Sequence, residues 1–226
     1  MKFTRDGEAG AVRSIAGRIC KGLHEGKHVV WLISGGSNIA PELAVMQLIK
    51  KQAGDALSSL AIIPIDERYG KAGHADSNTQ QLRVAGFDPG AATWVDVLAR
   101  NLSFAETVDF YNDATRVSLE NAAVIIGQIG LGNDGHIAGI LPGSPAIEAL
   151  DKVVIGYEWD DYMRMTLTPS ALRKVQIAYV LAYGESKAGP LKRLYENNEA
   201  FAELPAKLLY EIPEVRIYNN VITSEG

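Results

Sequence analysis

Short, continuous apolar runs alternate along the chain with longer segments in which apolar residues recur every three or four positions. Such runs are typical of strands buried on both faces of a sheet, and they occur at 28–33, 60–65 and 122–129. Helical spacing predicts helices at 7–23, 41–50, 77–85 and 103–119. This order of strand, helix and strand predicts an α/β fold with a mostly parallel sheet.

The second half of the chain carries a weaker version of the same pattern. It predicts strands at 153–157, 163–167, 176–182 and 215–218, and helices at 186–197 and 205–209. No internal repeat, low-complexity tract or long linker marks a boundary. We therefore expect a single domain over residues 1–226, built as an open sheet with helices on both faces.

Each of the first three predicted strands ends in a polar segment that contains glycine. These segments are 34–38, 66–70 and 130–136. In open parallel sheets, ligands bind beyond the carboxyl ends of the strands. The three segments are therefore expected to meet at one site.

The first segment contains Ser34, Gly35, Gly36 and Ser37. Glycine lets backbone N–H groups approach an anion, hydroxyls can donate to phosphate oxygens, and a helix N-terminus would add its dipole. The pattern fits equally well a tight turn in which Ser37 or the residue after it caps a helix. The segment is not a P-loop, because it lacks the Gly-Lys-Ser/Thr ending.

The second segment places Asp66, Glu67 and Arg68 at the end of a strand. An arginine can bind phosphate through two parallel hydrogen bonds, and a carboxylate can orient a hydroxyl or a catalytic group. A surface cluster of ion pairs is the alternative interpretation. The position of the cluster at a strand end favours function.

The third segment is the most informative, because three glycines surround Asp134 and His136. Glycine indicates a close approach to a ligand. Histidine has an unperturbed pKa near neutrality, so His136 can accept a proton from water and return it to a leaving oxygen. The residue type and its position predict a catalytic role.

Composition narrows the function further. The chain has 226 residues with 27 acidic and 22 basic side chains, a formal charge of −5, and no cluster of basic residues that would predict nucleic-acid binding. No apolar run is long enough to span a membrane, and Cys20 is the only cysteine. A single cysteine also excludes a four-thiolate metal site within one chain. We expect a cytoplasmic monomer that uses no metal and binds a small molecule.

Two further cations belong to short polar motifs. Arg164 begins the segment Arg-Met-Thr-Leu-Thr, and Lys187 ends Gly-Glu-Ser-Lys after a predicted strand. Both can supply positive charge to a site at the strand ends. On spacing alone, each is more typical of a solvated surface residue.

Taken together, these motifs resemble the 6-phosphogluconolactonase branch of the family that also contains glucosamine-6-phosphate deaminase. The resemblance rests on Ser-Gly-Gly-Ser, Asp-Glu-Arg followed by Ser77-Asn78, the loop 130–136, and the motifs of Arg164 and Lys187. It implies a Rossmann-like fold of the sugar-phosphate isomerase type. It also implies hydrolysis of 6-phospho-D-glucono-1,5-lactone, the second step of the oxidative pentose phosphate pathway, without metal or organic cofactor.

The resemblance also implies roles for individual residues. His136 would be the general base for water and then the acid for the ring oxygen, with Asp134 and Asp66 as further catalytic residues. The remaining residues would bind phosphate or the developing oxyanion: Arg68, Arg164, Lys187, Ser34, Gly35, Gly36 and Ser37.

Two alternatives stay open. The segment 137–142, Ile-Ala-Gly-Ile-Leu-Pro, replaces the usual Thr-Ala-Ser-Leu-Phe-Pro of the lactonases, and Asn38 replaces a threonine. His136-Ile137-Ala138 matches the deaminase sequence. However, the glutamate of the deaminase loop is missing, and Arg68 stands where deaminases carry tyrosine. A sugar-phosphate-binding regulator without catalysis is the second alternative. Substitution of His136 by alanine separates a catalyst from a regulator.

Overall fold

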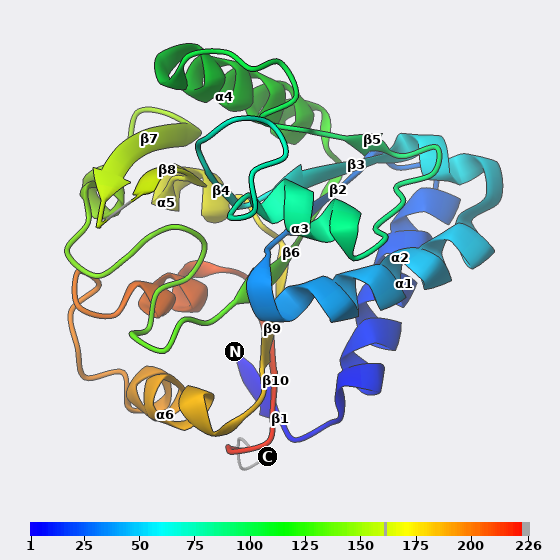
Figure 1. Cartoon of the computed structure of the whole chain (residues 1–226). Helices are drawn as coiled ribbons and strands as arrows, with labels where there is room; N and C mark the ends of the chain where they lie inside the picture. The colour runs from blue at the N-terminus through cyan, green and yellow to red at the C-terminus, as the bar shows by residue number, and fades with distance from the viewer. Residues whose placement is uncertain (161, 223–226) are drawn as a thin grey trace.

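The computed structural model describes residues 1–160 and 162–222. Seven strands form one sheet in the order β1-β10-β9-β6-β2-β3-β5, and every neighbouring pair is parallel. The strands are β1 (Lys2–Thr4), β2 (Val29–Ile33), β3 (Leu60–Pro64), β5 (Thr93–Trp94), β6 (Val124–Gly130), β9 (Ile177–Ala182) and β10 (Glu214–Asn219). The predicted parallel sheet is confirmed, and the structure adds the short strands β1 and β5 (Figure 1).

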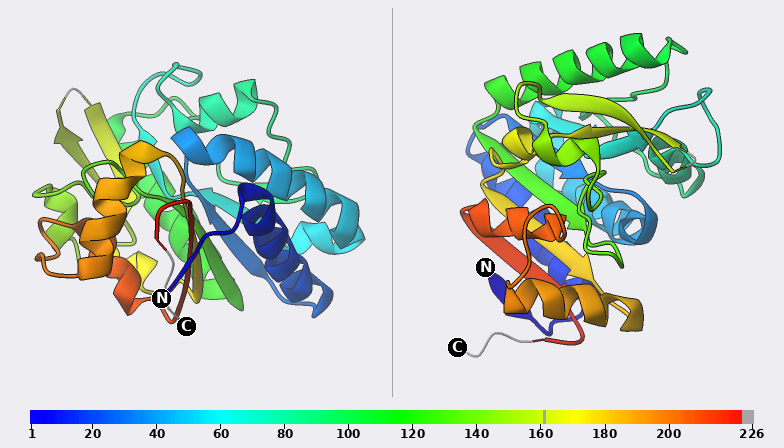
Figure 2. Two further views of the ribbon diagram at one scale, coloured as in Figure 1. Left: turned by 90° about the horizontal axis from the view of Figure 1, so that it is seen from below. Right: turned by 90° about the vertical axis from the view of Figure 1, so that its left-hand side faces the viewer.

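Helices cover both faces of this sheet, as expected (Figure 2). One face carries α1 (Glu8–His24), α2 (Ile39–Ala53) and α3 (Asn78–Val84), whose apolar side chains pack with Trp31 and Tyr179. The other face carries α4 (Phe104–Asn121), α5 (Pro169–Leu172), α6 (Ala188–Glu196) and the 3₁₀ segment η5 (Pro205–Glu211). The central strands are buried on both sides, which explains their continuous apolar runs.

The short 3₁₀ segments complete the connections between these elements. They are η1 (Gly36–Asn38), η2 (Gly54–Ser59), η3 (Pro145–Glu148) and η4 (Glu185–Lys187). Both η1 and η4 lie at the start of a longer helix, α2 and α6 respectively. No helix in the described part of the chain is both long and apolar enough to cross a membrane.

A second, antiparallel sheet was not predicted. It has the order β4-β8-β7, formed by β4 (Asp66–Arg68), β7 (Val154–Trp159) and β8 (Tyr162–Leu167). The prediction of a polar loop after β3 was therefore wrong over 66–68, because these residues pair with β8. The small sheet lies above the carboxyl ends of the parallel strands (Figure 1).

The chain order of the parallel strands creates a switch point. After β2 the chain proceeds to β3 and β5 on one side, and it then returns to β6 on the other side of β2. The loops that follow β2 and β6 consequently separate at their carboxyl ends. This is the position at which open α/β sheets bind ligands.

Candidate active site

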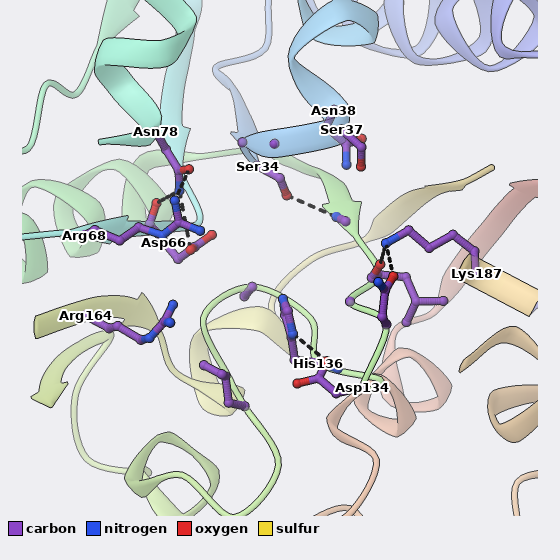
Figure 3. A pocket seen from close by; sticks show the side chains of 18 residues that line it. Ser34, Ser37, Asn38, Asp66, Arg68, Asn78, Asp134, His136, Arg164 and Lys187 are labelled. Carbon is purple, nitrogen blue, oxygen red and sulfur yellow. Dashed lines mark hydrogen bonds and ion pairs between the residues drawn. The ribbon is translucent and has the colours of Figure 1, made fainter. Parts of the chain in front are cut away.

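A pocket of about 500 Å³ opens at the carboxyl ends of β2, β6 and β9, with the small sheet as its opposite wall. All the site residues predicted from the sequence line it. They are Ser34, Gly35, Gly36, Ser37, Asp66, Arg68, Asp134, His136, Arg164 and Lys187. The structure thus brings together five segments that are far apart in the sequence (Figure 3).

The loop after β2 forms one side of the pocket. Ser34 is buried; its hydroxyl donates to the carbonyl oxygen of Gln128 at 3.0 Å and accepts from the N–H of Gly130 at 3.1 Å. It therefore ties the ends of β2 and β6 together. Ser37 is exposed at the N-terminal end of the helical segment η1–α2, where unpaired N–H groups and the helix dipole favour an anion.

Gly35 lets this loop lie directly against the opposite wall. A Cβ atom at Gly35 would stand 2.2 Å from Oδ1 of Asn78. Only a glycine fits at this separation without a shift of the neighbouring segment. The glycine therefore serves packing at the pocket in addition to any approach to a ligand.

The loop after β6 holds a histidine and carboxylate pair. Nδ1 of His136 lies 2.6 Å from Oδ1 of Asp134, which also accepts from the backbone N–H of His136 at 3.1 Å. Burial would raise the pKa of Asp134, but the hydrogen bonds from His136 outweigh it and lower the pKa to about 2. Because an ionised carboxylate can only accept, Nδ1 carries the proton and Nε2 is free to act as a base.

The tight turn around this pair depends on Gly132. A Cβ atom there would stand 2.2 Å from Nδ1 of His136 and 2.6 Å from Oδ1 of Asp134. Gly132 therefore permits a close approach of the His136 and Asp134 side chains, whereas the sequence suggested an approach to a ligand. Arg193 holds the same loop from α6, donating to the carbonyl oxygen of Asp134 at 2.8 Å.

Lys187 lies on the side of the pocket formed by this loop. Its Nζ donates to the carbonyl oxygen of Leu131 at 2.6 Å and to Oδ1 of Asn133 at 3.0 Å. Burial lowers the pKa of Lys187, and the neighbouring Asp134 carboxylate acts in the opposite direction. No carboxylate forms an ion pair with Lys187 within residues 1–160 and 162–222, so its charge is available to an anion.

The small sheet supplies two more cations. Arg68 and Arg164 are paired directly across the β4–β8 ladder, and their Nε atoms are buried without a hydrogen-bond partner. Neither guanidinium has an ion-pair partner among the described residues. Like charges directly opposite each other in a sheet are unfavourable unless an anion lies between them. This wall therefore suits an anionic ligand.

The sequence analysis assigned no role to four further lining residues, namely Asn78, Asn133, Ala138 and Leu141. Asn78 contacts two residues of β4: its Nδ2 donates to the carbonyl oxygen of Asp66 at 2.9 Å, and its Oδ1 accepts from Arg68 at 3.2 Å. The signal that could have identified it is Ser77, which caps α3 and so places the first turn of that helix at the pocket.

The pocket offers the groups that a reaction at a carbonyl requires. A base with an oriented tautomer lies between cations on two sides, with Arg68 and Arg164 on one and Lys187 on the other (Figure 3). Across the described ranges, no group of three His, Cys, Asp or Glu side chains is arranged to hold a metal ion. This set can activate water, bind a phosphate and stabilise an oxyanion.

Comparisons with known proteins agree with this chemistry. A sequence profile of the family described as glucosamine-6-phosphate isomerases/6-phosphogluconolactonase matches residues 6–217. A 6-phosphogluconolactonase from Synechocystis is 25% identical over 214 residues, covering 88% of this chain and 85% of the relative.

Solved structures share the fold. A 6-phosphogluconolactonase from Shewanella baltica superposes with a TM-score of 0.73 at 22% identity, covering 96% of this chain and 95% of its own. A monomeric glucosamine-6-phosphate deaminase superposes with a TM-score of 0.78 at 16% identity, covering 97% of each chain. At these identities the superpositions establish the architecture that both activities use.

Proposed function

Because the chain belongs to the glucosamine-6-phosphate isomerase/6-phosphogluconolactonase family, we propose that it hydrolyses 6-phospho-D-glucono-1,5-lactone to 6-phosphogluconate. The observation that carries the proposal is the His136–Asp134 pair at 2.6 Å in a pocket with cations on two sides. The substrate has one phosphate group and one ester carbonyl, and the pocket has a positive group for each.

In the proposed reaction, Nε2 of His136 removes a proton from water as the water oxygen attacks the lactone carbonyl carbon. The carbonyl oxygen becomes an oxyanion, which a neighbouring cation stabilises. The bond between that carbon and the ring oxygen then breaks, and His136 returns the proton to the ring oxygen. The products are a free hydroxyl and a carboxylic acid, which releases its proton to solvent to become a carboxylate, and the histidine is regenerated.

The proposed supporting roles follow from where each group lies. Asp134 holds the reactive tautomer of His136, and Asp66 orients a substrate hydroxyl. Arg68, Arg164 and Lys187, together with the N–H groups at the start of η1–α2, share the binding of phosphate and oxyanion. We place the reaction in the cytoplasm, in one domain that needs no metal.

The lining of the pocket favours the lactonase over the deaminase. Asp66, Asp134 and His136 are the carboxylate and imidazole groups among the described lining residues, and no glutamate is present. Glu42 and Glu67 lie nearby, but both side chains are fully buried and neither lines the pocket. The catalytic loop of the deaminases contains a glutamate, and the corresponding segment 137–142 of this chain does not.

The decisive experiment measures 6-phosphogluconate formation from freshly generated lactone against the spontaneous rate, alongside ammonia release from glucosamine 6-phosphate. We expect acceleration of lactone hydrolysis only. His136→Ala should lower kcat by about 10²- to 10⁴-fold, the usual contribution of general acid–base catalysis, while phosphate binding persists. Ammonia release would instead assign the chain to the deaminase branch, and a fully active H136A variant would remove the histidine from the mechanism.

A further inference from the structure

Glu67 lies between two pocket residues but does not reach the pocket itself. Successive side chains of a strand point to opposite faces, so Asp66 and Arg68 face the pocket and Glu67 points behind the wall. Its side chain is fully buried, with 0% of its surface exposed. A buried carboxylate is costly unless it is well hydrogen-bonded, so its contacts indicate what it does.

Four donors converge on this carboxylate. Oε1 accepts from the backbone N–H groups of Arg68 and Asn78, both at 2.8 Å. Oε2 accepts from the N–H of Thr79 at 2.9 Å and from the hydroxyl of Ser77 at 3.0 Å. Burial raises the pKa of Glu67, and the hydrogen bonds from Thr79, Arg68 and Asn78 act against that rise. Backbone N–H groups can only donate, so this set matches an ionised carboxylate.

The segment fastened in this way holds the guanidinium of Arg68. Nη1 of Arg68 donates to the carbonyl oxygen of Asp76 at 3.1 Å and to Oδ1 of Asn78 at 3.2 Å. These two acceptors precede and follow Ser77, whose hydroxyl Glu67 fixes. Figure 3 shows the amide of Asn78 directed at Arg68 and Asp66. The direction of the guanidinium therefore depends on a segment that Glu67 anchors.

We propose that Glu67 is a positioning residue for anion binding, fixing residues 76–79 against β4 so that Arg68 points into the pocket. The inference rests on the proposed function only in requiring that the pocket binds a phosphate group. A purely structural glutamate would stabilise the fold without affecting what Arg68 contributes to binding.

A double-mutant cycle distinguishes these roles. Binding of inorganic phosphate is measured by phosphorus NMR for the wild type, Glu67→Gln, Arg68→Ala and the double variant. The glutamine side chain turns an NH₂ group toward two of the four donors. We expect Glu67→Gln to weaken binding about tenfold, as the loss of one charge-assisted hydrogen bond would. In the Arg68→Ala background, where Arg164 and Lys187 still bind phosphate weakly, the same change should cost less than about twofold.

A second variant covers the possibility that Glu67→Gln does not fold. Asn78→Ala keeps the backbone N–H groups that Glu67 binds but removes the side-chain link to Arg68. It should therefore weaken phosphate binding about tenfold, and it should cause little further loss when it is combined with Arg68→Ala. Ile19→Val, which removes a buried methyl group from α1 in the core on the face of the sheet opposite α4, is the control for reduced stability and should bind phosphate normally.

Three outcomes would overturn the proposal: equal losses in both Arg68 backgrounds, unchanged binding in Glu67→Gln or Asn78→Ala, or no phosphate binding by the wild type. The measurement needs no turnover. If phosphate binding shows the coupling between Glu67 and Arg68 but the protein does not accelerate lactone hydrolysis, the proposed reaction is refuted and the role of Glu67 stands.

Discussion

Asp134 keeps its negative charge beside His136 over the whole range in which enzymes are assayed. The hydrogen bonds from His136 overcome the effect of burial and lower the pKa of Asp134 to about 2, whereas the pKa of an unfolded aspartate is about 3.9. Its contribution to stability is therefore fully present above about pH 4 and is lost as the pH falls toward about 2. Activity lost at mildly acidic pH cannot come from protonation of Asp134.

Replacing Asp134 with asparagine tests whether the carboxylate selects the tautomer of His136. The amide can donate to Nδ1 and so place the proton on Nε2, where a base is needed. We expect kcat to fall by about 10²- to 10⁴-fold, as occurs when the carboxylate beside a catalytic histidine becomes an amide. Steady-state kinetics and phosphate titration measure this. Weaker phosphate binding with unchanged kcat would contradict the assigned role.

Glu42 differs from Asp134 in that its carboxyl group has very few hydrogen-bond partners. Its side chain is fully buried, Oε1 accepts from the N–H of Ser34 at 2.8 Å, and Oε2 has no hydrogen-bond partner. Burial raises the pKa of Glu42 well above its ordinary value, and the nearby Asp66 acts in the same direction. Burial behind Ser34 therefore favours the neutral form of this carboxyl.

Substitution of Glu42 by glutamine should reveal this neutral state through its pH dependence. A raised pKa in the folded state means that stability is full below the unfolded value of about 4.3 and declines as the pH rises toward the folded value. Glutamine removes this decline. The stability of Glu42→Gln relative to the wild type should grow by up to about 1.4 kcal/mol per pH unit above pH 4.3.

Urea unfolding at several pH values between about 4.5 and 7 measures the difference for Glu42→Gln. The exposed residue Glu148, substituted in the same way, is the control and should add no pH dependence. A constant or shrinking stability difference across this range would show that Glu42 is ionised in the folded protein.

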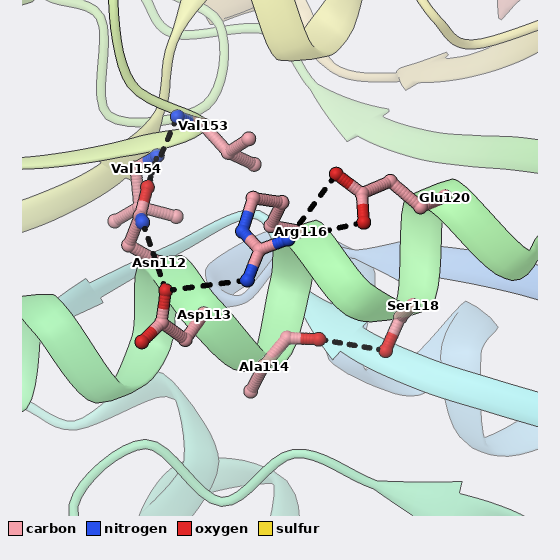
Figure 4. Close-up of polar contacts among 8 residues, drawn as sticks. All are labelled: Asn112, Asp113, Ala114, Arg116, Ser118, Glu120, Val153 and Val154. Atoms are coloured by element: carbon pink, nitrogen blue, oxygen red, sulfur yellow. Dashed lines mark hydrogen bonds and ion pairs between the residues drawn. The ribbon is translucent and has the colours of Figure 1, made fainter.

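The hairpin of β7 and β8 carries Arg164, and α4 holds this hairpin in place. Oδ1 of Asn112 on α4 accepts from the N–H groups of Val153 and Val154 at 3.0 and 3.1 Å, at the start of β7 (Figure 4). Gly156 of the same strand allows close packing, because a Cβ there would lie 2.4 Å from Val108 of α4. A helix outside the pocket thus positions one of its walls.

Asn112→Ala should therefore affect both stability and binding. Two N–H donors lose their acceptor, which costs about 1–3 kcal/mol in unfolding free energy. Phosphate affinity should also fall, because the hairpin that carries Arg164 is less well fixed. Asn112→Asp keeps an acceptor oxygen and is the matched control, expected to retain most of both properties. A loss of stability with unchanged phosphate affinity would separate α4 from the pocket wall.

The elements that the sequence predicted well are long and strongly patterned, and those it missed are short. Periodicity identified α1 and α4 and the central strands, because each repeats its pattern over several turns or is buried on both faces. The three residues of β4 are all charged, and they form a strand only because β8 lies alongside. Local propensity contains no information about that partner, so the antiparallel sheet could not be predicted.

At the scale of the whole molecule, one topological rule accounts for most of the predicted site. Loops beyond the carboxyl ends of parallel strands meet, so the segments 34–38, 66–70 and 130–136 could be placed together from the sequence, whereas Arg164 and Lys187 were added by the family resemblance. Their chemical roles remain predictions. Asn78 and Leu141 were given no role in the site, because the first lies inside a predicted helix, with the cap Ser77 as its one nearby signal, and the second lies in an apolar segment.

The distribution of exposed apolar side chains bears on oligomeric state. Among the described residues, most of the large exposed ones lie on different elements, including Val84 on α3, Val117 on α4 and Tyr195 on α6, while Tyr162 and Met163 are neighbours on β8. Stable interfaces need a continuous apolar patch, which this scatter does not provide. Sedimentation equilibrium should therefore give the mass of one chain, 24.4 kDa. A mass twice that value would disprove the expected monomer.

The division between the two sheets has a consequence for how such an enzyme can change over generations. His136 and Asp134 lie in the loop after the central strand β6 of the parallel sheet, whereas the paired arginines belong to the small antiparallel sheet. Mutations in the hairpin can therefore alter which anionic compound is accepted without disturbing proton transfer. Selection can act on substrate preference and on chemistry separately, and laboratory evolution of new specificity should begin with the hairpin.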